Sequence, residues 1–204
     1  ALNTKPQIAL VGCGYWGKNL CRNFYALGAL SAVVDATEIG HKAARSITSD
    51  VEITDNLDDI LRDDQIKGIA LATPAETHAE LAIQAMQAGK DVFVEKPMAL
   101  TLEDAEEMKK VAEKTGRVLM VGHLLEYHPA VLKLREMIAS GELGKINYIY
   151  SNRLNFGKVR TEENALWSFA PHDVAVILRL MGKEPEEVSA CGGSYLTRGV
   201  SDIT

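Results

Sequence analysis

The chain has few of the residues that mark disulfide-rich or metal-binding proteins. Its three cysteines among 204 residues are Cys13, Cys21 and Cys191. They match neither a zinc site nor a redox pair, which indicates free buried thiols in a reducing compartment. The histidines His41, His123 and His128 also lack metal-ligand spacing. We therefore predict no metal site.

Long apolar runs and excess positive charge are also absent. No apolar run approaches the roughly 18 residues that a membrane-spanning helix needs, and the N-terminal residues do not read as a signal peptide. The formal net charge is −6, whereas nucleic-acid binding needs a concentrated basic face. With 47% hydrophobic and 25% charged residues, the composition excludes a disordered chain. We expect a cytoplasmic globular protein that binds neither membrane nor nucleic acid.

The first 122 residues alternate short apolar segments with amphipathic ones. The predicted strands cover residues 7–11, 30–34, 51–53, 66–72, 91–95 and 118–122. The predicted helices cover residues 18–27, 41–48, 56–62, 77–88 and 101–114. Apolar strands without alternation are buried on both faces, as in a parallel sheet covered by helices. We predict a doubly wound α/β Rossmann domain over residues 1–122.

Residues 123–204 have a different pattern. The predicted helices cover residues 129–140 and 171–181, the second with Pro171 in its first turn, and the predicted strands cover residues 145–155 and 187–196. In the first of these strands Ile146, Tyr148 and Tyr150 alternate with polar residues, which predicts one covered face in an antiparallel or mixed sheet. Two strands make a poor sheet, so either further chain or a partner completes it. We expect a partial α/β domain and a homo-oligomer, a dimer or tetramer.

Gly12, Gly14 and Gly17 form a G-x-G-x-x-G motif between the first predicted strand and the first predicted helix. In that context the motif indicates a dinucleotide site. The first glycine permits a tight turn, the second lets the backbone approach a pyrophosphate, and the third lets helix and strand pack closely. The helix N-terminus attracts phosphates. Tyr15 and Trp16 are expected to pack along this cofactor loop, although a turn without a ligand is the alternative.

Asp35 ends the second predicted strand, 18 residues after Gly17. A carboxylate there accepts hydrogen bonds from a ribose 2′-hydroxyl and repels a 2′-phosphate. The sequence therefore favours NAD over NADP as the cofactor. The alternative is that Asp35 only caps a turn.

Glu95, Lys96 and Pro97 follow the fifth predicted strand, at the carboxyl end where doubly wound sheets bind ligands. Burial disfavours the charged form of a lysine, so a lysine in a partly dry cleft is suited to exchange a proton with a substrate hydroxyl. The alternative is a surface lysine in a turn.

Three motifs together resemble the Gfo/Idh/MocA family, which includes glucose–fructose oxidoreductase and inositol dehydrogenase. They are the glycine motif of residues 12–17, Thr73 and Pro74 followed by His78, and the segment of residues 89–97. The resemblance covers the whole chain and implies a Rossmann domain followed by an α/β domain with an open, mostly antiparallel sheet. Family members are usually longer, so it also implies that the second domain, residues 123–204, is truncated.

The resemblance assigns roles to individual residues of the first domain. Lys96 matches the family's catalytic lysine, and His78 matches a histidine that opens the following helix. The further positions that it predicts to line the cofactor are Thr73, Pro74, His78, Glu95, Lys96 and Pro97.

The family's second motif, Asp-x-x-x-His near the substrate, matches residues 168–172. His172 fits and is expected to be catalytic, whereas Ser168 replaces the aspartate. A second departure is Glu126-Tyr127, where many members place an arginine before an aromatic residue. Without the resemblance, His172 reads as a helix-capping or core histidine.

Residues 152–155 and 160–173 resemble a subgroup of UDP-sugar 3-dehydrogenases that act in bacterial surface polysaccharide assembly. Residues 143–161 contain no acid, and arginines there suit the phosphates of a nucleotide sugar. The predicted substrate contacts are Arg153, Asn155, Arg160, Trp167 and His172. The alternatives are a solvated strand edge for the basic residues and packing for the tryptophan.

We therefore predict an NAD-dependent oxidoreductase that transfers hydride between nicotinamide and a sugar secondary alcohol. The expected substrate is a UDP-N-acetyl sugar or its uronate, oxidised at C3, with His172 or Lys96 removing the hydroxyl proton. Two alternatives remain open. One is an NAD(H)-binding regulator without chemistry, and the other is a dehydrogenase of a free sugar or inositol.

Overall fold

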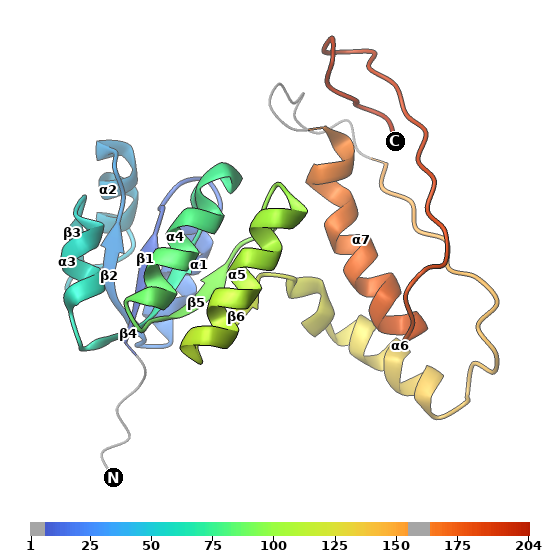
Figure 1. Ribbon diagram of the computed structural model, residues 1–204, viewed down its shortest axis with the longest axis horizontal. Helices are drawn as coiled ribbons and strands as arrows, with labels where there is room; N and C mark the ends of the chain where they lie inside the picture. The colour runs from blue at the N-terminus through green and yellow to red at the C-terminus, as the bar shows by residue number, and fades with distance from the viewer. Residues whose placement is uncertain (1–6, 155–163) are drawn as a thin grey trace. The chain divides into compact units, whose positions relative to one another are not determined.

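The computed structural model describes residues 7–154 and 164–204 (Figure 1). The chain divides into two compact units, one that ends at Gly122 and one that begins at His123. Among the helices in the described ranges, none is long and apolar enough to cross a membrane.

The first unit is a parallel sheet with helices on both faces (Figure 1). Its strands are β1 (Gln7–Val11), β2 (Leu30–Val34), β3 (Glu52–Thr54), β4 (Ile66–Leu71), β5 (Asp91–Val94) and β6 (Leu119–Val121). Its helices are α1 (Gly17–Ala26), α2 (Glu38–Arg45), α3 (Leu57–Arg62), α4 (His78–Gln87) and α5 (Leu102–Thr115), with a 3₁₀ turn η1 (Ala75–Thr77). The six strands run in the order β3-β2-β1-β4-β5-β6, and every neighbouring pair is parallel. The predicted α/β class and doubly wound order are confirmed.

Alternate residues of the strands supply two separate cores, one on each face of the sheet. On β1, Ala9 and Val11 belong to a cluster that includes Met86 of α4 and Met108 of α5. The intervening Leu10 belongs to the cluster that α1 and α2 cover. Because both faces are buried, the strands show no polar alternation.

Capping side chains determine where two of these helices begin. The Thr101 hydroxyl accepts a hydrogen bond from the Asp104 amide at the start of α5, as the sequence predicts. The Thr37 hydroxyl accepts one from the Gly40 amide, so α2 begins at Glu38 and ends at Arg45. The prediction of a helix over residues 41–48 is therefore wrong in its bounds, because the cap at Thr37 lies before the apolar pattern.

In the part of the second unit that the structure describes there are a 3₁₀ turn, η2 (Leu124–Tyr127), and two helices, α6 (Pro129–Ala139) and α7 (Ala165–Met181). Asn164 caps α7 through a hydrogen bond from the Trp167 amide, and Pro171 lies inside the helix. The prediction that Pro171 occupies the first turn is wrong. The preceding turn forms because its N-terminal cap stabilises it independently of the proline.

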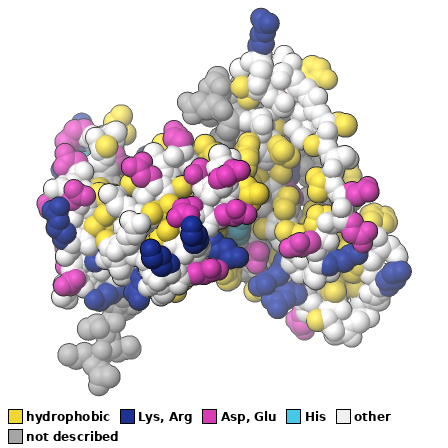
Figure 2. Space-filling model, in the orientation of Figure 1, with side chains coloured by type: hydrophobic (Ala, Val, Ile, Leu, Met, Phe, Trp, Pro, Cys, Tyr) yellow, Lys and Arg dark blue, Asp and Glu magenta, His cyan; other side chains and the backbone are white. Residues whose placement is uncertain are grey.

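The strands predicted over residues 145–155 and 187–196 are not formed within the described residues, where this unit has only the isolated bridges Gly193–Ile203 and Thr197–Val200. The side chains of Tyr148 and Tyr150 are 82% and 79% exposed, and hydrophobic side chains of this unit reach the surface (Figure 2). The predicted covered face is therefore wrong as well. A strand needs a partner for its backbone groups, and neither segment finds one among the described residues of this unit.

The cysteines of the two units differ in burial. Cys13 and Cys21 are buried free thiols in the first unit, as expected. Cys191 is exposed, contrary to the expectation, because it lies in the extended segment of the second unit.

Candidate functional site

The carboxyl ends of four neighbouring strands carry the predicted cofactor residues. The strand registers pair Val11 with Val34 and Leu71, and Leu71 with Val94, so β1, β2, β4 and β5 end side by side. In doubly wound sheets this edge is where ligands bind, at the point where the strand order reverses. The residues that follow these strands are the glycine loop 12–17, Asp35, Thr73 with Pro74, and Glu95 with Lys96 and Pro97.

The three glycines of the loop have different local surroundings. Gly12 has a φ of +89°, and a Cβ there would lie 2.8 Å from the Ala72 carbonyl oxygen. A Cβ on Gly17 would lie 2.1 Å from the Gly12 carbonyl oxygen. A Cβ on Gly14 would meet no atom within 4 Å. The fold therefore requires the first and third glycines, whereas the second faces open space.

Asp35 links the end of β2 to this loop. Its Oδ2 accepts a hydrogen bond from the Cys13 amide at 2.7 Å, and its Oδ1 accepts from the amide and hydroxyl of Thr37 at 2.8 and 2.7 Å. Burial alone would raise the pKa of Asp35, but these bonds together hold it below its usual value. A carboxylate has about four acceptor positions. The anion therefore has capacity for a ribose hydroxyl, which fits the residue's predicted role with NAD.

Glu95 joins the opposite side of the site to the same loop. Only 6% of its surface is exposed, and its Oε1 accepts a hydrogen bond from the Trp16 indole at 2.7 Å. Its Oε2 accepts from the Lys96 amide at 3.3 Å. Burial raises the pKa of Glu95 despite these bonds. Tyr15, in contrast, is 95% exposed beside the loop.

His78 connects the ends of β4 and β5. Its Nδ1 lies 2.8 Å from the Pro97 carbonyl oxygen and its Nε2 lies 3.0 Å from the Thr73 carbonyl oxygen. The side chain is 1% exposed. These two contacts indicate that His78 links the segment that carries Thr73 to the segment that carries Lys96.

In the second unit, α7 carries two of the predicted substrate residues, Trp167 and His172, and Arg153 lies in the segment before the undescribed residues. Arg153 donates through Nε to Asp173, and the Ser151 hydroxyl donates to the same carboxylate at 2.7 Å. Burial alone would raise the pKa of Asp173, but these hydrogen bonds outweigh that effect and hold the pKa below its usual value. His172 is half-buried next to it, and Trp167 is 41% exposed one turn earlier. Asn155 and Arg160 lie outside the described residues.

Two contacts were not anticipated from the sequence. One is the Trp16–Glu95 hydrogen bond, between residues 79 positions apart. The other is an ion pair of 3.3 Å between Arg179 of α7 and Glu126, a residue that departs from the pattern expected from the family resemblance. Neither contact has a local sequence signal, because each depends on how distant segments pack.

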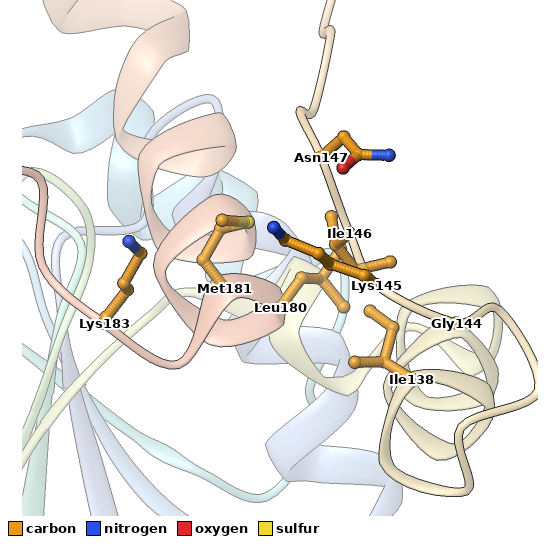
Figure 3. Close-up of a pocket in the computed structure, with 8 residues that line it drawn as sticks. All are labelled: Ile138, Gly144, Lys145, Ile146, Asn147, Leu180, Met181 and Lys183. Atoms are coloured by element: carbon orange, nitrogen blue, oxygen red, sulfur yellow. The ribbon is translucent and has the colours of Figure 1, made fainter.

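A hollow in the second unit is separate from these residues. It measures about 510 Å³ and lies between Ile138 of α6, Leu180 and Met181 of α7, and the lysines Lys145 and Lys183 (Figure 3). None of the predicted catalytic or substrate residues in the described ranges lines it.

Comparison with known proteins supports the same division of the chain. Residues 7–123 match the family model GFO_IDH_MocA, described as "Oxidoreductase family, NAD-binding Rossmann fold". Residues 131–204 match the model of the GFO/IDH/MocA C-terminal domain. The two matches follow each other along the chain as the two units do.

Individual relatives are similar over nearly the whole chain. A 2,7-anhydro-N-acetylneuraminate hydratase from Mediterraneibacter gnavus is 32% identical over 201 residues, which are 94% of this chain and 53% of the hydratase. A UDP-N-acetylglucosamine 3-dehydrogenase from Acidithiobacillus ferrooxidans is 29% identical over 94% of this chain and 59% of that enzyme. The chain thus spans about half the length of the curated relatives it matches.

Solved structures agree with the fold. The crystal structure of GenD2 from gentamicin A biosynthesis, in complex with NAD, superimposes with a TM-score of 0.75 at 26% identity. The superimposed region covers 90% of this chain and 55% of GenD2. Because two models of one family match the two parts of the chain in order, and the first unit has the glycine loop and strand-end geometry of an NAD-binding Rossmann domain, this chain belongs to the Gfo/Idh/MocA oxidoreductase family.

Proposed function

We propose that this chain forms the cofactor domain and part of the substrate domain of an NAD-dependent dehydrogenase that oxidises a secondary alcohol on a sugar ring. The favoured substrate is a UDP-N-acetyl sugar or its uronate, oxidised at C3. The cytoplasmic location and the homo-oligomeric state expected from the sequence stay predictions.

The observation that carries this proposal is the position of Lys96. It follows directly after the buried Glu95 at the carboxyl end of β5, and Glu95 is hydrogen-bonded to the cofactor loop through Trp16. An amine at this edge of the sheet lies where doubly wound domains hold a ligand. A surface lysine in an unconstrained turn would have no such connection.

The roles of the residues follow from their chemistry. Bound NAD supplies the hydride acceptor. Gly14 would leave space for the pyrophosphate of bound NAD, and Asp35 would accept hydrogen bonds from its adenosine ribose. Lys96 hydrogen-bonds the substrate hydroxyl, and either His172 or Lys96 removes its proton.

The relative that is a UDP-N-acetylglucosamine 3-dehydrogenase supports a nucleotide sugar as the substrate. On the second unit, Asp173 accepts a hydrogen bond from Nε of Arg153 and another from the Ser151 hydroxyl. A guanidinium has five N–H donors, so its other nitrogens are suited to bind a phosphate. Arg153 is therefore our candidate for the diphosphate.

A second candidate function is hydration of an anhydro sugar acid. Its support is the Mediterraneibacter gnavus hydratase, which is 32% identical over 94% of this chain. The two candidates differ in their cofactor balance. A dehydrogenase accumulates NADH as substrate is consumed, whereas a hydratase changes its substrate with no net change in NADH.

The test measures NADH absorbance and substrate consumption with UDP-N-acetyl sugars, their uronates, free sugars, inositols and anhydro sugar acids. We expect NADH to accumulate with a UDP-sugar. Lys96→Met should lower turnover by about 10²–10⁴-fold, the usual contribution of acid–base catalysis, while NADH affinity changes by less than about threefold.

The matched control is Lys67→Met, because Lys67 is an exposed lysine at the start of β4. It should keep the parent turnover. Normal turnover in Lys96→Met would remove Lys96 from the mechanism. Tight NADH binding without conversion of any compound would favour the non-catalytic regulator, and turnover of inositols alone would change the substrate class.

A further inference from the structure

The Glu95 carboxylate is the meeting point of three segments of the first unit. Trp16, from the loop after β1, donates to Oε1 at 2.7 Å, and the Lys96 amide, after β5, donates to Oε2 at 3.3 Å. Gly122, directly after β6, lies against the same carboxyl group. The Glu95 side chain thus contacts the cofactor loop and the segments that follow β5 and β6.

The space around this carboxylate is closely fitted. A Cβ on Gly122 would lie 3.1 Å from the carboxyl carbon and from both oxygens of Glu95. The Gly122 amide donates to the Val94 carbonyl at 2.8 Å, which fixes the glycine relative to β5. The carboxylate therefore has the Gly122 backbone close to it and a hydrogen bond from the Trp16 indole, and both contacts limit its position.

The charge of Glu95 makes these contacts energetically important. Burial raises the pKa of its carboxyl group, and the Trp16 indole, the Lys96 amide and the nearby Lys96 and His78 side chains oppose that rise. A hydrogen bond to a charged group is stronger than one between neutral groups, and a buried acceptor that loses its donor is destabilising. The anion therefore needs Trp16 as a donor.

We propose that Trp16 is a positioning residue for Lys96, an inference that rests on the proposed function. The indole N–H fixes the Glu95 carboxylate, and this carboxylate holds the amide of Lys96 at the point where the chain leaves the sheet. Because Trp16 also belongs to the loop that receives the pyrophosphate, the hydrogen bond sets the distance between the cofactor and the catalytic amine. Trp16 itself takes no part in proton or hydride transfer.

The first experiment needs neither substrate nor cofactor. Hydrogen exchange of the Lys96 amide is measured in the parent protein and in Trp16→Phe, which keeps an aromatic ring but removes the donor. The amide should exchange about ten- to a hundredfold faster in the variant, the change that loss of one hydrogen bond to a charged group predicts. Unchanged protection of the Lys96 amide would overturn the proposal.

The second variant is Glu95→Gln, which keeps the shape of the side chain but removes its charge. An amide has one carbonyl oxygen, so it cannot serve both the indole and the Lys96 amide as the carboxylate does. We expect faster exchange of the Lys96 amide here as well. If Trp16→Phe does not fold, this variant decides the proposal by the same measurement.

The matched control is Tyr25→Phe, which removes an aromatic donor to another carboxylate. The Tyr25 hydroxyl donates to Asp50 at 2.8 Å. This exposed hydrogen bond involves no residue at the carboxyl ends of the strands, where the candidate site lies. Its loss should leave exchange of the Lys96 amide and turnover unchanged. Equal acceleration in Tyr25→Phe and Trp16→Phe would mean general loosening of the domain and would contradict a positioning role.

Kinetics then separates positioning from binding. With a sugar that is turned over, Trp16→Phe should lower kcat by about ten- to a hundredfold, while KM for NAD changes by less than about threefold. A rise in KM alone would assign Trp16 to cofactor binding and overturn the proposal. If the parent protein turns over no sugar, the proposed function fails, and the exchange experiment still decides whether Trp16 positions Lys96.

Discussion

Both units of the chain contain apolar and amphipathic segments, but the two units bury their apolar side chains to very different extents. In the first unit, two clusters of buried side chains cover both faces of the sheet. In the second unit, Ser168 is the one buried residue in the described ranges, while Tyr148, Leu154 and Val188 are each more than 80% exposed. The difference shows that an apolar pattern leads to burial only where its partner segments are present.

The largest expected difference is in independent folding. Residues 1–122 alone should unfold cooperatively in urea with a free energy of unfolding of about 5–15 kcal/mol, because all six paired strands belong to this unit. Residues 123–204 alone should show no cooperative transition, because they bury too little apolar surface to offset conformational entropy. Circular dichroism across a urea titration measures both. A sharp transition in the second fragment would contradict the comparison.

Within the first unit, alanine substitution at two glycines of one loop should affect different properties, stability at Gly17 and NADH binding at Gly14. Gly17→Ala places a Cβ 2.1 Å from a backbone oxygen, so it should lower the free energy of unfolding by about 3 kcal/mol or more. Gly14→Ala meets no atom within 4 Å, so stability should change by less than about 0.5 kcal/mol while NADH binding weakens. Urea unfolding and NADH fluorescence titration separate the two effects. Equal destabilisation by both variants would show that the loop geometry is wrong.

The smallest expected effect concerns acid stability. The pKa of Asp35 is lowered in the folded state, so its contribution to stability is present above the unfolded pKa of about 3.9 and is lost as pH falls further. Asp35→Asn should lower stability at neutral pH by less than about 1 kcal/mol and flatten the acid decline, because the site is partly exposed. Melting temperatures from neutral pH to about pH 3 measure this.

Asp173 provides the control from the other unit, since its pKa is also lowered. Asp173→Asn should leave the unfolding transition of the first unit unchanged at every pH. A change in that transition would mean that the two units are thermodynamically coupled.

Much of the first unit could be predicted because its signals are local. Apolar strands, the glycines at the start of α1 and the Thr101 cap each depend on residues within a few positions of one another. The start of α2 was missed because Thr37 lies outside the apolar pattern, and the start of α7 because a proline inside a helix resembles a first turn.

The sequence by itself determined the order of strands and helices in the first unit, the glycine loop, and the positions of Asp35 and Lys96 at strand ends. Hydrophobic periodicity and backbone constraints act over short distances, so the residues alone carry that information. Only the tertiary structure decided that Trp16 meets Glu95, that Arg179 pairs with Glu126, and that Tyr148 and Tyr150 stay exposed. These outcomes depend on which distant segments pack together, and no local pattern encodes that choice.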